Sequence, residues 1–248
     1  MQQPSEQAIR QIIELIDLTN LAKDCDEAAI ELLCAQTSTQ KGKVAAVCLW
    51  PKFVKRARQR LGASSSIKIA TVVNFPGGAD SADTCCAMID QAITNGANEI
   101  DYVLPYQHYL SGNIANVTSA LKRVRTCTPG DIHLKVILET GILHSAEHIK
   151  ATSELAIDHG ADFIKTSTGK VEINATLATA NIMLDVIAKK NRHIGFKPAG
   201  GIRTVADAQA YLQLATEKLG SSWLNADHFR FGASGLLQEA LSYNDSDH

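Results

Sequence analysis

Two short stretches, NGANEID (residues 95–101) and HGADFIK (residues 159–165), share the pattern that decides the fold. In each, a glycine that ends a helix is followed by a short turn and a β-rich run. Such runs recur roughly every 30 residues, and an amphipathic segment with helical spacing follows each of them. The runs are 16–19, 44–49, 67–73, 99–104, 133–139, 162–166, 193–198 and 229–232. This alternation predicts a parallel sheet.

The repeated strand–helix unit favours an α/β fold, namely a (β/α)8 TIM barrel with an additional N-terminal helix. Several runs are apolar on both faces, as strands between a core and outer helices should be, and eight of them can close a barrel. The additional helix is expected to run to about Ile13. No linker or composition shift interrupts the chain, so residues 1–248 are expected to form a single domain.

An open doubly wound sheet uses the same alternation and is the structural rival. That fold places a glycine signature after its first strand, whereas IDLTNLAKD (residues 16–24) contains no glycine. Glycine clusters follow the late strands instead, a distribution that fits a barrel better.

Composition and charge exclude several classes of protein. Hydrophobic residues make up 45%, charged residues 20% and aromatic residues 5%, as in a globular protein with an aliphatic core. A net charge of −2 leaves no basic field for nucleic acid or anionic lipid. The start, MQQPSEQAIR, has no signal-peptide core, and no stretch reaches the ~18 apolar residues of a membrane helix. A cytoplasmic protein without nucleic-acid or membrane partners is expected.

Cysteine and histidine spacing gives no sign of a metal site or a disulfide framework. The cysteines have no paired CxxC spacing, so all six are expected to be free thiols. They are Cys25, Cys34, Cys48, Cys85, Cys86 and Cys127. His144 and His148 stand four apart on a predicted helix, but no third ligand accompanies them, and no metal is expected.

Charged residues stand inside the predicted strands, where a buried core rarely tolerates them. They are Asp17, Asp101, Lys135, Glu139, Lys165 and Lys197. The two-residue period of a strand puts Lys165 on the same face as Phe163, so Lys165 points into the barrel if that face is the interior. The three lysines would then come from three successive strands. The alternative is a set of structural ion pairs at the barrel rim.

A lysine cluster of this kind predicts covalent chemistry at a carbonyl group. Neighbouring lysines in a partly desolvated cavity are expected to lower one another's pKa, which makes a neutral amine available. Such an amine attacks a carbonyl to give a carbinolamine and then an imine, which draws electrons from the adjacent carbon. Asp101 would lie near enough to accept or deliver protons. The pattern therefore predicts an aldolase that works through Lys165.

Three glycine-containing segments follow the last three predicted strands and suggest an anion site. They are STGK (residues 167–170), PAGGIRT (198–204) and GASG (232–235). Glycines let backbone N–H groups face a ligand, and barrels often hold a phosphate after strands seven and eight. Lys170 could add a charged contact, and Thr204 with Asp207 resembles a helix capping box. Each turn by itself could also simply reverse the chain.

At this point the chain resembles the deoxyribose-phosphate aldolase family, over nearly its whole length. FIKTSTGK (residues 163–170) and FKPAGGIRT (196–204) are the most diagnostic segments. Further matching segments occur in the same order: IDLTNL (16–21), VAAVCLWP (44–51), TVVNFPGG (71–78), NEIDYVLP (98–105) and FRFGAS (229–234).

The resemblance implies a role for individual residues. Lys165 would form the imine, with Asp101 and Lys197 as a proton relay that works through ordered water. The residues implied around the substrate and its phosphate are Thr19, Cys48, Thr168, Gly169, Lys170, Gly200, Gly201, Ser234 and Gly235.

The implied reaction is reversible cleavage of 2-deoxy-D-ribose 5-phosphate to acetaldehyde and D-glyceraldehyde 3-phosphate, in deoxyribonucleoside breakdown. No cofactor and no metal are implied, and the assembly expected is a monomer or homodimer. Two alternatives are an imine-forming aldolase for another phosphorylated substrate and a non-catalytic barrel that binds sugar phosphates.

Two positions depart from the family pattern. Gly235 stands where bacterial relatives commonly carry a second serine, so one hydroxyl contact to phosphate would be lost while the backbone N–H remains. Relatives often end in a tyrosine that reaches the site, whereas this chain ends SYNDSDH, with Tyr243 as the nearest counterpart.

Overall fold

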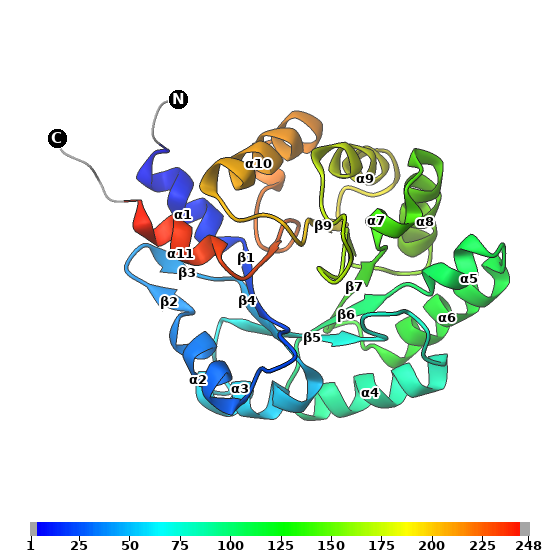
Figure 1. The fold of residues 1–248 in the computed structure, drawn as a ribbon, viewed down its shortest axis with the longest axis horizontal. Coiled ribbons are helices and arrows are strands. Elements are labelled where there is room, and N and C mark those ends of the chain that lie inside the picture. The colour runs from blue at the N-terminus through cyan, green and yellow to red at the C-terminus, as the bar shows by residue number, and fades with distance from the viewer. Residues whose placement is uncertain (1–3, 244–248) are drawn as a thin grey trace.

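The computed structural model describes residues 4–243, and eight parallel strands form the ring at its centre (Figure 1). These strands are β1 (Ile16–Asn20), β4 (Ala46–Leu49), β5 (Lys68–Val73), β6 (Glu99–Val103), β7 (His133–Ile137), β8 (Phe163–Lys165), β9 (Gly195–Lys197) and β10 (Phe231–Ala233). They pair in the order β10-β1-β4-β5-β6-β7-β8-β9. Isolated parallel bridges, Phe196 with Phe229 and Ala199 with Gly232, join β9 to the β10 segment and close the ring.

Helices surround the ring, as the alternating pattern predicts. Their bounds are α2 (Glu27–Ala35), α3 (Val54–Leu61), α4 (Ala82–Thr94), α5 (Tyr106–Leu110), α6 (Ile114–Cys127), α7 (Thr140–Leu143), α8 (Ala146–Asp158), α9 (Leu177–Lys190), α10 (Val205–Leu219) and α11 (Leu236–Ser242). The (β/α)8 prediction is therefore confirmed, and the open-sheet rival is wrong because its two edges are joined.

The expected N-terminal helix is also present. Helix α1 (Glu6–Glu14) begins at Ser5, whose side chain accepts a hydrogen bond from the N–H of Ala8. The helix lies beside α10 and α11 (Figure 1), and it buries Ile9, Ile12 and Ile13. The sequence pattern did not predict the small hairpin of β2 (Ser38–Thr39) and β3 (Gly42–Lys43), because two-residue strands carry no detectable period.

Phe163 fills the barrel beneath the charged residues. Gly195 on the next strand is required by this packing, because a Cβ atom there would lie 2.3 Å from the Phe163 ring. Lys135 Nζ and the Arg230 guanidinium lie 5.9 and 5.8 Å from the centre of the same ring. The ring therefore forms an apolar floor under a layer of charge.

The expectation that all six cysteines are free thiols is wrong for two of them. Cys86 on α4 and Cys127 at the end of α6 form a disulfide with a Cα–Cα distance of 5.6 Å. The two cysteines are 41 positions apart in sequence, and only the packing of α4 against α6 brings them together. Within residues 4–243, no helix is both long enough and apolar enough to cross a membrane.

Candidate active site

The candidate catalytic residues converge inside the barrel from neighbouring strands. Lys165 and Lys197 are paired at the ends of β8 and β9, and Asp101 lies in the middle of β6. Asp101 is opposite Lys135 of β7 in the strand register. All four side chains are buried, as expected for residues on the inner face of the strands.

Asp101 binds a lysine with each of its oxygens. Oδ2 accepts hydrogen bonds from Lys165 Nζ and Lys197 Nζ, both at 2.8 Å. Oδ1 accepts one from Lys135 Nζ at 3.1 Å. The Cys48 thiol lies 4.0 Å from Oδ2. A single carboxylate oxygen therefore links the two lysines at the strand ends, while the other oxygen is held from the side of β7.

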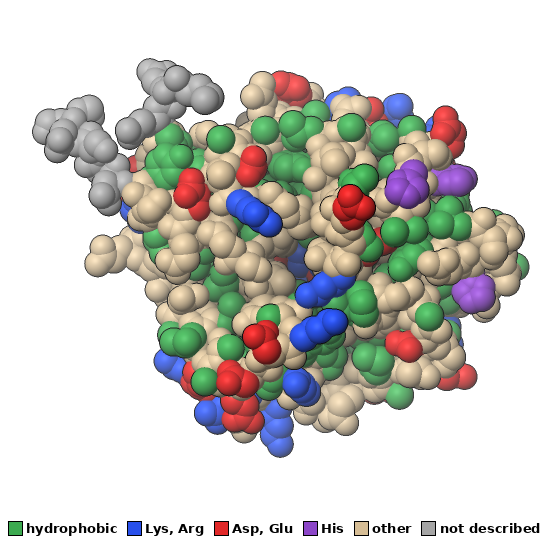
Figure 2. Space-filling view, in the orientation of Figure 1, with side chains coloured by type: hydrophobic (Ala, Val, Ile, Leu, Met, Phe, Trp, Pro, Cys, Tyr) green, Lys and Arg blue, Asp and Glu red, His purple; other side chains and the backbone are tan. Residues whose placement is uncertain are grey.

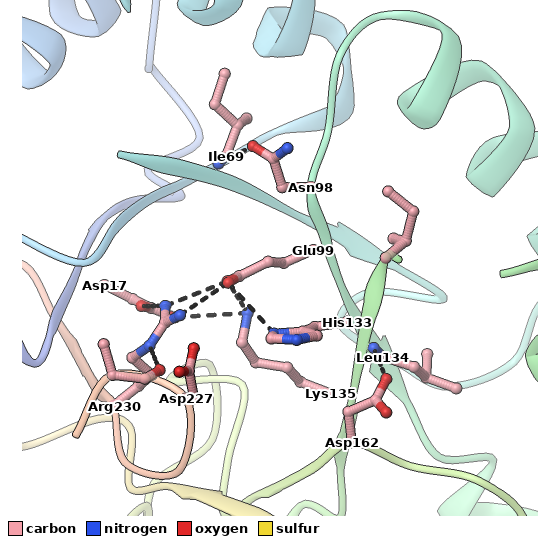
Figure 3. Close-up of polar contacts among 12 residues, drawn as sticks. Asp17, Ile69, Asn98, Glu99, His133, Leu134, Lys135, Asp162, Asp227 and Arg230 are labelled. Carbon is pink, nitrogen blue, oxygen red and sulfur yellow. Dashed lines mark hydrogen bonds and ion pairs between the residues drawn. The ribbon is translucent and has the colours of Figure 1, made fainter. Parts of the chain in front are cut away.

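A second group of buried charges adjoins this one, and Figure 3 shows Asp17, Glu99, Lys135 and Arg230 pointing toward one another. Arg230 binds Asp17 at 2.6 Å and Glu99 at 2.9 Å, while Lys135 donates to Glu99. Asp17 in turn accepts from Lys197 Nζ at 2.5 Å. The two groups form one continuous network of ion pairs, and such buried charges are tolerated only when they are paired.

The pairing reverses one expectation, that neighbouring lysines lower one another's pKa. Burial opposes the charge on Lys197, but Asp101 and Asp17 outweigh it and raise its pKa. In Lys135, burial is likewise outweighed by Asp101, Glu99 and Asp17, and the pKa is raised. The expectation is wrong for these two residues because each lysine has carboxylates as its nearest neighbours.

The carboxylates show the complementary effect. Burial disfavours the charge on Asp101, yet Lys135, Lys165 and Lys197 hold its pKa well below the usual range. The pKa of Glu99 is also held well below its usual range, by Lys135 and Arg230 against the effect of burial. Asp101 is therefore an ionised hydrogen-bond acceptor at neutral pH.

A count of the buried charges singles out Lys165. Three carboxylates (Asp17, Glu99 and Asp101) face four cations (Lys135, Lys165, Lys197 and Arg230), so one positive charge is in excess. Lys165 lines a cavity, whereas the other three cations do not. Lys165 is therefore the one amine of the network that a carbonyl compound in the cavity can reach.

The cavity above Lys165 has a volume of about 690 Å³. It is lined by residues from β1 and from the loops after β8, β9 and β10. Figure 2 shows a hollow near the centre of this face, with Lys and Arg side chains along one side. Eight expected substrate-site residues line the cavity: Thr19, Thr168, Gly169, Lys170, Gly200, Gly201, Ser234 and Gly235. Cys48 does not line it and lies fully buried beside Asp101.

Glycines shape the loops around the cavity. Gly169, Gly200 and Gly201 have φ of +79°, +83° and +86°, a region that disfavours other residues. Lys170 Nζ donates to the carbonyl of Leu21 at 2.8 Å and thereby spans the cavity toward β1. Helix α10 begins at Thr204 with the predicted capping box.

Tyr243, at the end of α11, is not among the residues that line the cavity. Its ring packs against the core, and its carbonyl accepts a hydrogen bond from Lys41 beside the β2–β3 hairpin. The rest of the tail, residues 244–248, lies outside the described part of the chain.

Comparison with known proteins agrees with this geometry. Residues 11–237 match the family model described as DeoC/LacD family aldolase. The chain belongs to this aldolase family. A curated deoxyribose-phosphate aldolase of Agrobacterium fabrum is 47% identical over 242 residues, covering 98% of this chain and 93% of the relative.

Solved structures of candidate deoxyribose-phosphate aldolases share the fold of this aldolase. One from Coccidioides immitis has a TM-score of 0.81 at 29% identity and covers 97% of this chain and 88% of its own. Another, from Toxoplasma gondii ME49, has a TM-score of 0.86 at 25% identity and covers 97% and 98%.

Sequence reasoning missed part of the aldolase's site. Glu99 and Arg230 belong to the buried network, and their charges within the predicted runs 99–104 and 229–232 were the signal that could have found them. Asn20 lines the cavity from the end of β1, and Leu21 and Arg203 line it from loops, where no period marks them. The described residues contain no cluster of three or more side chains suited to hold a metal ion.

Proposed function

We propose that this aldolase reversibly cleaves 2-deoxy-D-ribose 5-phosphate to acetaldehyde and D-glyceraldehyde 3-phosphate through an imine on Lys165. One observation carries the proposal: Lys165 is the buried cation that lines the cavity, and it shares an oxygen of Asp101 with Lys197. The identity to the Agrobacterium fabrum relative supports the choice of substrate.

In the direction of synthesis, the uncharged amine of Lys165 attacks the carbonyl carbon of acetaldehyde. The carbinolamine takes up a proton on its hydroxyl, loses it as water and becomes a protonated imine. The imine nitrogen withdraws electrons, so a proton leaves the methyl carbon and an enamine forms. The enamine carbon then attacks the aldehyde carbon of glyceraldehyde 3-phosphate, whose oxygen takes up a proton, and water releases the product from Lys165.

Asp101 and Lys197 are suited to move these protons. Asp101 Oδ2 accepts from both lysines at 2.8 Å, so it can pass a proton between the position of the imine and Lys197. The raised pKa of Lys197 favours its role as the proton-holding partner. Ordered water would complete the path to the substrate carbon.

The loops after β8, β9 and β10 would hold the phosphate. Gly169, Gly200 and Gly201 permit close approach of backbone N–H groups, and Lys170 supplies a positive charge beside them. Ser234, whose hydroxyl donates to the carbonyl of Thr19 at 2.9 Å, lies across the cavity on the β10 side. Cys48 would contact the substrate only after movement, because it is fully buried.

Reduction by borohydride in the presence of acetaldehyde tests this proposal. The expected result is a mass increase of one two-carbon unit on the peptide that contains Lys165, absent from Lys165→Met. An unmodified Lys165 would refute catalysis and favour a barrel that only binds sugar phosphates. Trapping without turnover of deoxyribose 5-phosphate would favour an aldolase for another phosphorylated substrate.

The remaining parts of the proposal concern the setting of the reaction. We propose a single-domain cytoplasmic enzyme of deoxyribonucleoside breakdown that acts as a monomer or homodimer. Sedimentation of the purified protein measures its assembly, and a sedimenting species with the mass of a tetramer would contradict the proposed monomer or homodimer. A disulfide between Cys86 and Cys127 is unusual in a reducing compartment, so thiol labelling in cell lysates tests the cytoplasmic setting, which reduced thiols at both positions would support.

A further inference from the structure

Glu139 is a buried carboxylate at the mouth of the barrel that takes no part in the network around Asp101. It follows β7, is fully buried, and forms no ion pair with any residue from 4 to 243. Burial raises its pKa, although hydrogen bonds from Thr168 and the charge of Lys165 oppose this. Burying a carboxylate without a paired cation destabilises a fold, so stability alone does not account for Glu139.

The backbone of Glu139 is strained as well. Its φ and ψ are both 59°, in the left-handed region that residues with a side chain rarely adopt. Such a conformation costs about 1 kcal/mol or more, and strain of this kind concentrates at functional sites.

The side chain of Glu139 holds the loop after β8. One oxygen accepts the Thr168 N–H at 3.2 Å, and the other accepts the Thr168 hydroxyl at 2.5 Å. The same hydroxyl oxygen accepts the Lys170 N–H at 3.1 Å. Glu139 therefore sets the direction of the Thr168 hydroxyl, and through it the turn that presents Gly169 and Lys170 to the cavity.

The left-handed turn at Glu139 also docks the short helix α7 onto this loop. The N–H of Thr140 donates to the carbonyl of Thr166 at 2.9 Å. Gly141 lies so close that a Cβ atom there would be 1.8 Å from the carbonyl oxygen of Ile173. Both ends of the loop after β8 are thus held by residues that follow Glu139.

We propose that Glu139 is a positioning residue that fixes the loop of residues 167–170 for the phosphate of the substrate. The inference rests on the proposed function, since that function places the phosphate at this loop. Glu139 does not line the cavity and acts through Thr168 and Lys170.

Two substitutions test the contribution of the Glu139 side chain. Glu139→Gly removes the carboxylate and relieves the left-handed strain, whereas Glu139→Gln keeps a side chain that can still bond Thr168. We expect Glu139→Gly to raise KM for deoxyribose 5-phosphate by about 10-fold or more. Glu139→Gln should restore KM to within about 3-fold of the unsubstituted protein, and neither should change kcat/KM for unphosphorylated deoxyribose by more than about 2-fold.

Asn74 offers a matched control. It is buried, has φ of 60°, and its side chain binds the carbonyl of Val103 and the N–H of Asp80, in the loop after β5. Asn74→Gly should leave KM for deoxyribose 5-phosphate unchanged. The inference is overturned if Glu139→Gly leaves KM for deoxyribose 5-phosphate unchanged. It is also overturned if kcat/KM falls by the same factor for deoxyribose 5-phosphate and for unphosphorylated deoxyribose.

Acetaldehyde trapping on Lys165 keeps this inference apart from the proposed function. Failure to trap in the unsubstituted protein refutes the proposed function, whereas normal trapping with an unchanged KM in Glu139→Gly refutes only the role of Glu139. If Glu139→Gly does not fold, a double-mutant cycle replaces it, in which KM is measured for Glu139→Gln, for Thr168→Val and for the double variant. Effects on KM that multiply as independent changes would then overturn the inference.

Discussion

The charge balance of the buried network predicts how the reactivity of Lys165 depends on pH. Lys135→Met removes one positive charge from the network and leaves a side chain of similar length. The raised pKa of Lys135 means that this charge is present throughout the neutral range in the unsubstituted protein. Without it, less positive charge surrounds the Lys165 amine, so acetaldehyde trapping on Lys165 should require a higher pH.

The size of this shift follows from the distances. Lys135 and Lys165 bind the two oxygens of Asp101 at 3.1 and 2.8 Å, so their nitrogens are no more than about 8 Å apart. Two unit charges at that separation interact by about 2 kcal/mol at an effective dielectric constant of about 20, or roughly 1.5 pH units. A shift of about 1.5 pH units toward alkaline pH is therefore expected in the midpoint of acetaldehyde trapping.

Glu99→Gln serves as the opposing variant. It removes a negative charge at an equally buried position, where Arg230 and Lys135 both bind, and the midpoint should move toward acid pH. The assay is borohydride trapping of acetaldehyde at a series of pH values, with the modified Lys165 peptide measured by mass spectrometry. Shifts in the same direction, or equal losses of trapping at all pH values without a shift, would refute the electrostatic reasoning.

Three further predictions follow from local geometry. A side chain at position 235 has open space, so Gly235→Ser should tighten the binding of inorganic phosphate by about 2- to 5-fold, as measured by calorimetry. Unchanged or weaker binding would contradict a phosphate contact at this position. Gly195→Ala should lower the free energy of unfolding by about 1–3 kcal/mol in urea, because its Cβ would meet Phe163, and an unaltered midpoint argues against that packing. Cys86→Ser removes the disulfide that closes a loop of 41 residues, and under oxidising conditions it should lower the free energy of unfolding by about 3 kcal/mol. Acetaldehyde trapping on Lys165 should stay the same. A free energy of unfolding equal to that of the unsubstituted protein would mean that the disulfide does not form.

The barrel could be predicted from the sequence because each strand carries its own signal. Runs such as 44–49 and 67–73 are largely apolar on both faces, so local patterns alone indicate β4 and β5. Strand ends were less well defined, and the predicted run 133–139 extended two residues beyond β7. The difference arises because Glu139 turns into the left-handed region, which the sequence pattern does not report.

Two signals predicted the candidate site: charges that interrupt apolar strands, and the glycine-containing turns of residues 167–170, 198–204 and 232–235. Lys165, Asp101 and Lys197 meet as expected, because the strand register of a barrel brings inner-face residues together. The sequence does not tell which charges become partners. The pKa of Lys197 was therefore expected to be lowered by neighbouring lysines, whereas neighbouring carboxylates raise it. Contacts between distant positions, such as Arg230 with Glu99, depend on ring closure.

The division of labour between strands and loops bears on how this enzyme could change its preferred aldehyde. The proposed bond-making groups stand on β6, β8 and β9 inside a rigid ring, whereas the segment of residues 198–204 and Ser234 stand on connections outside it. Replacing those connections alters which acceptor is recognised while the interior ion pairs keep their spacing. A laboratory lineage selected for acceptors without a phosphate should therefore accumulate its substitutions in these connections and leave the barrel interior untouched.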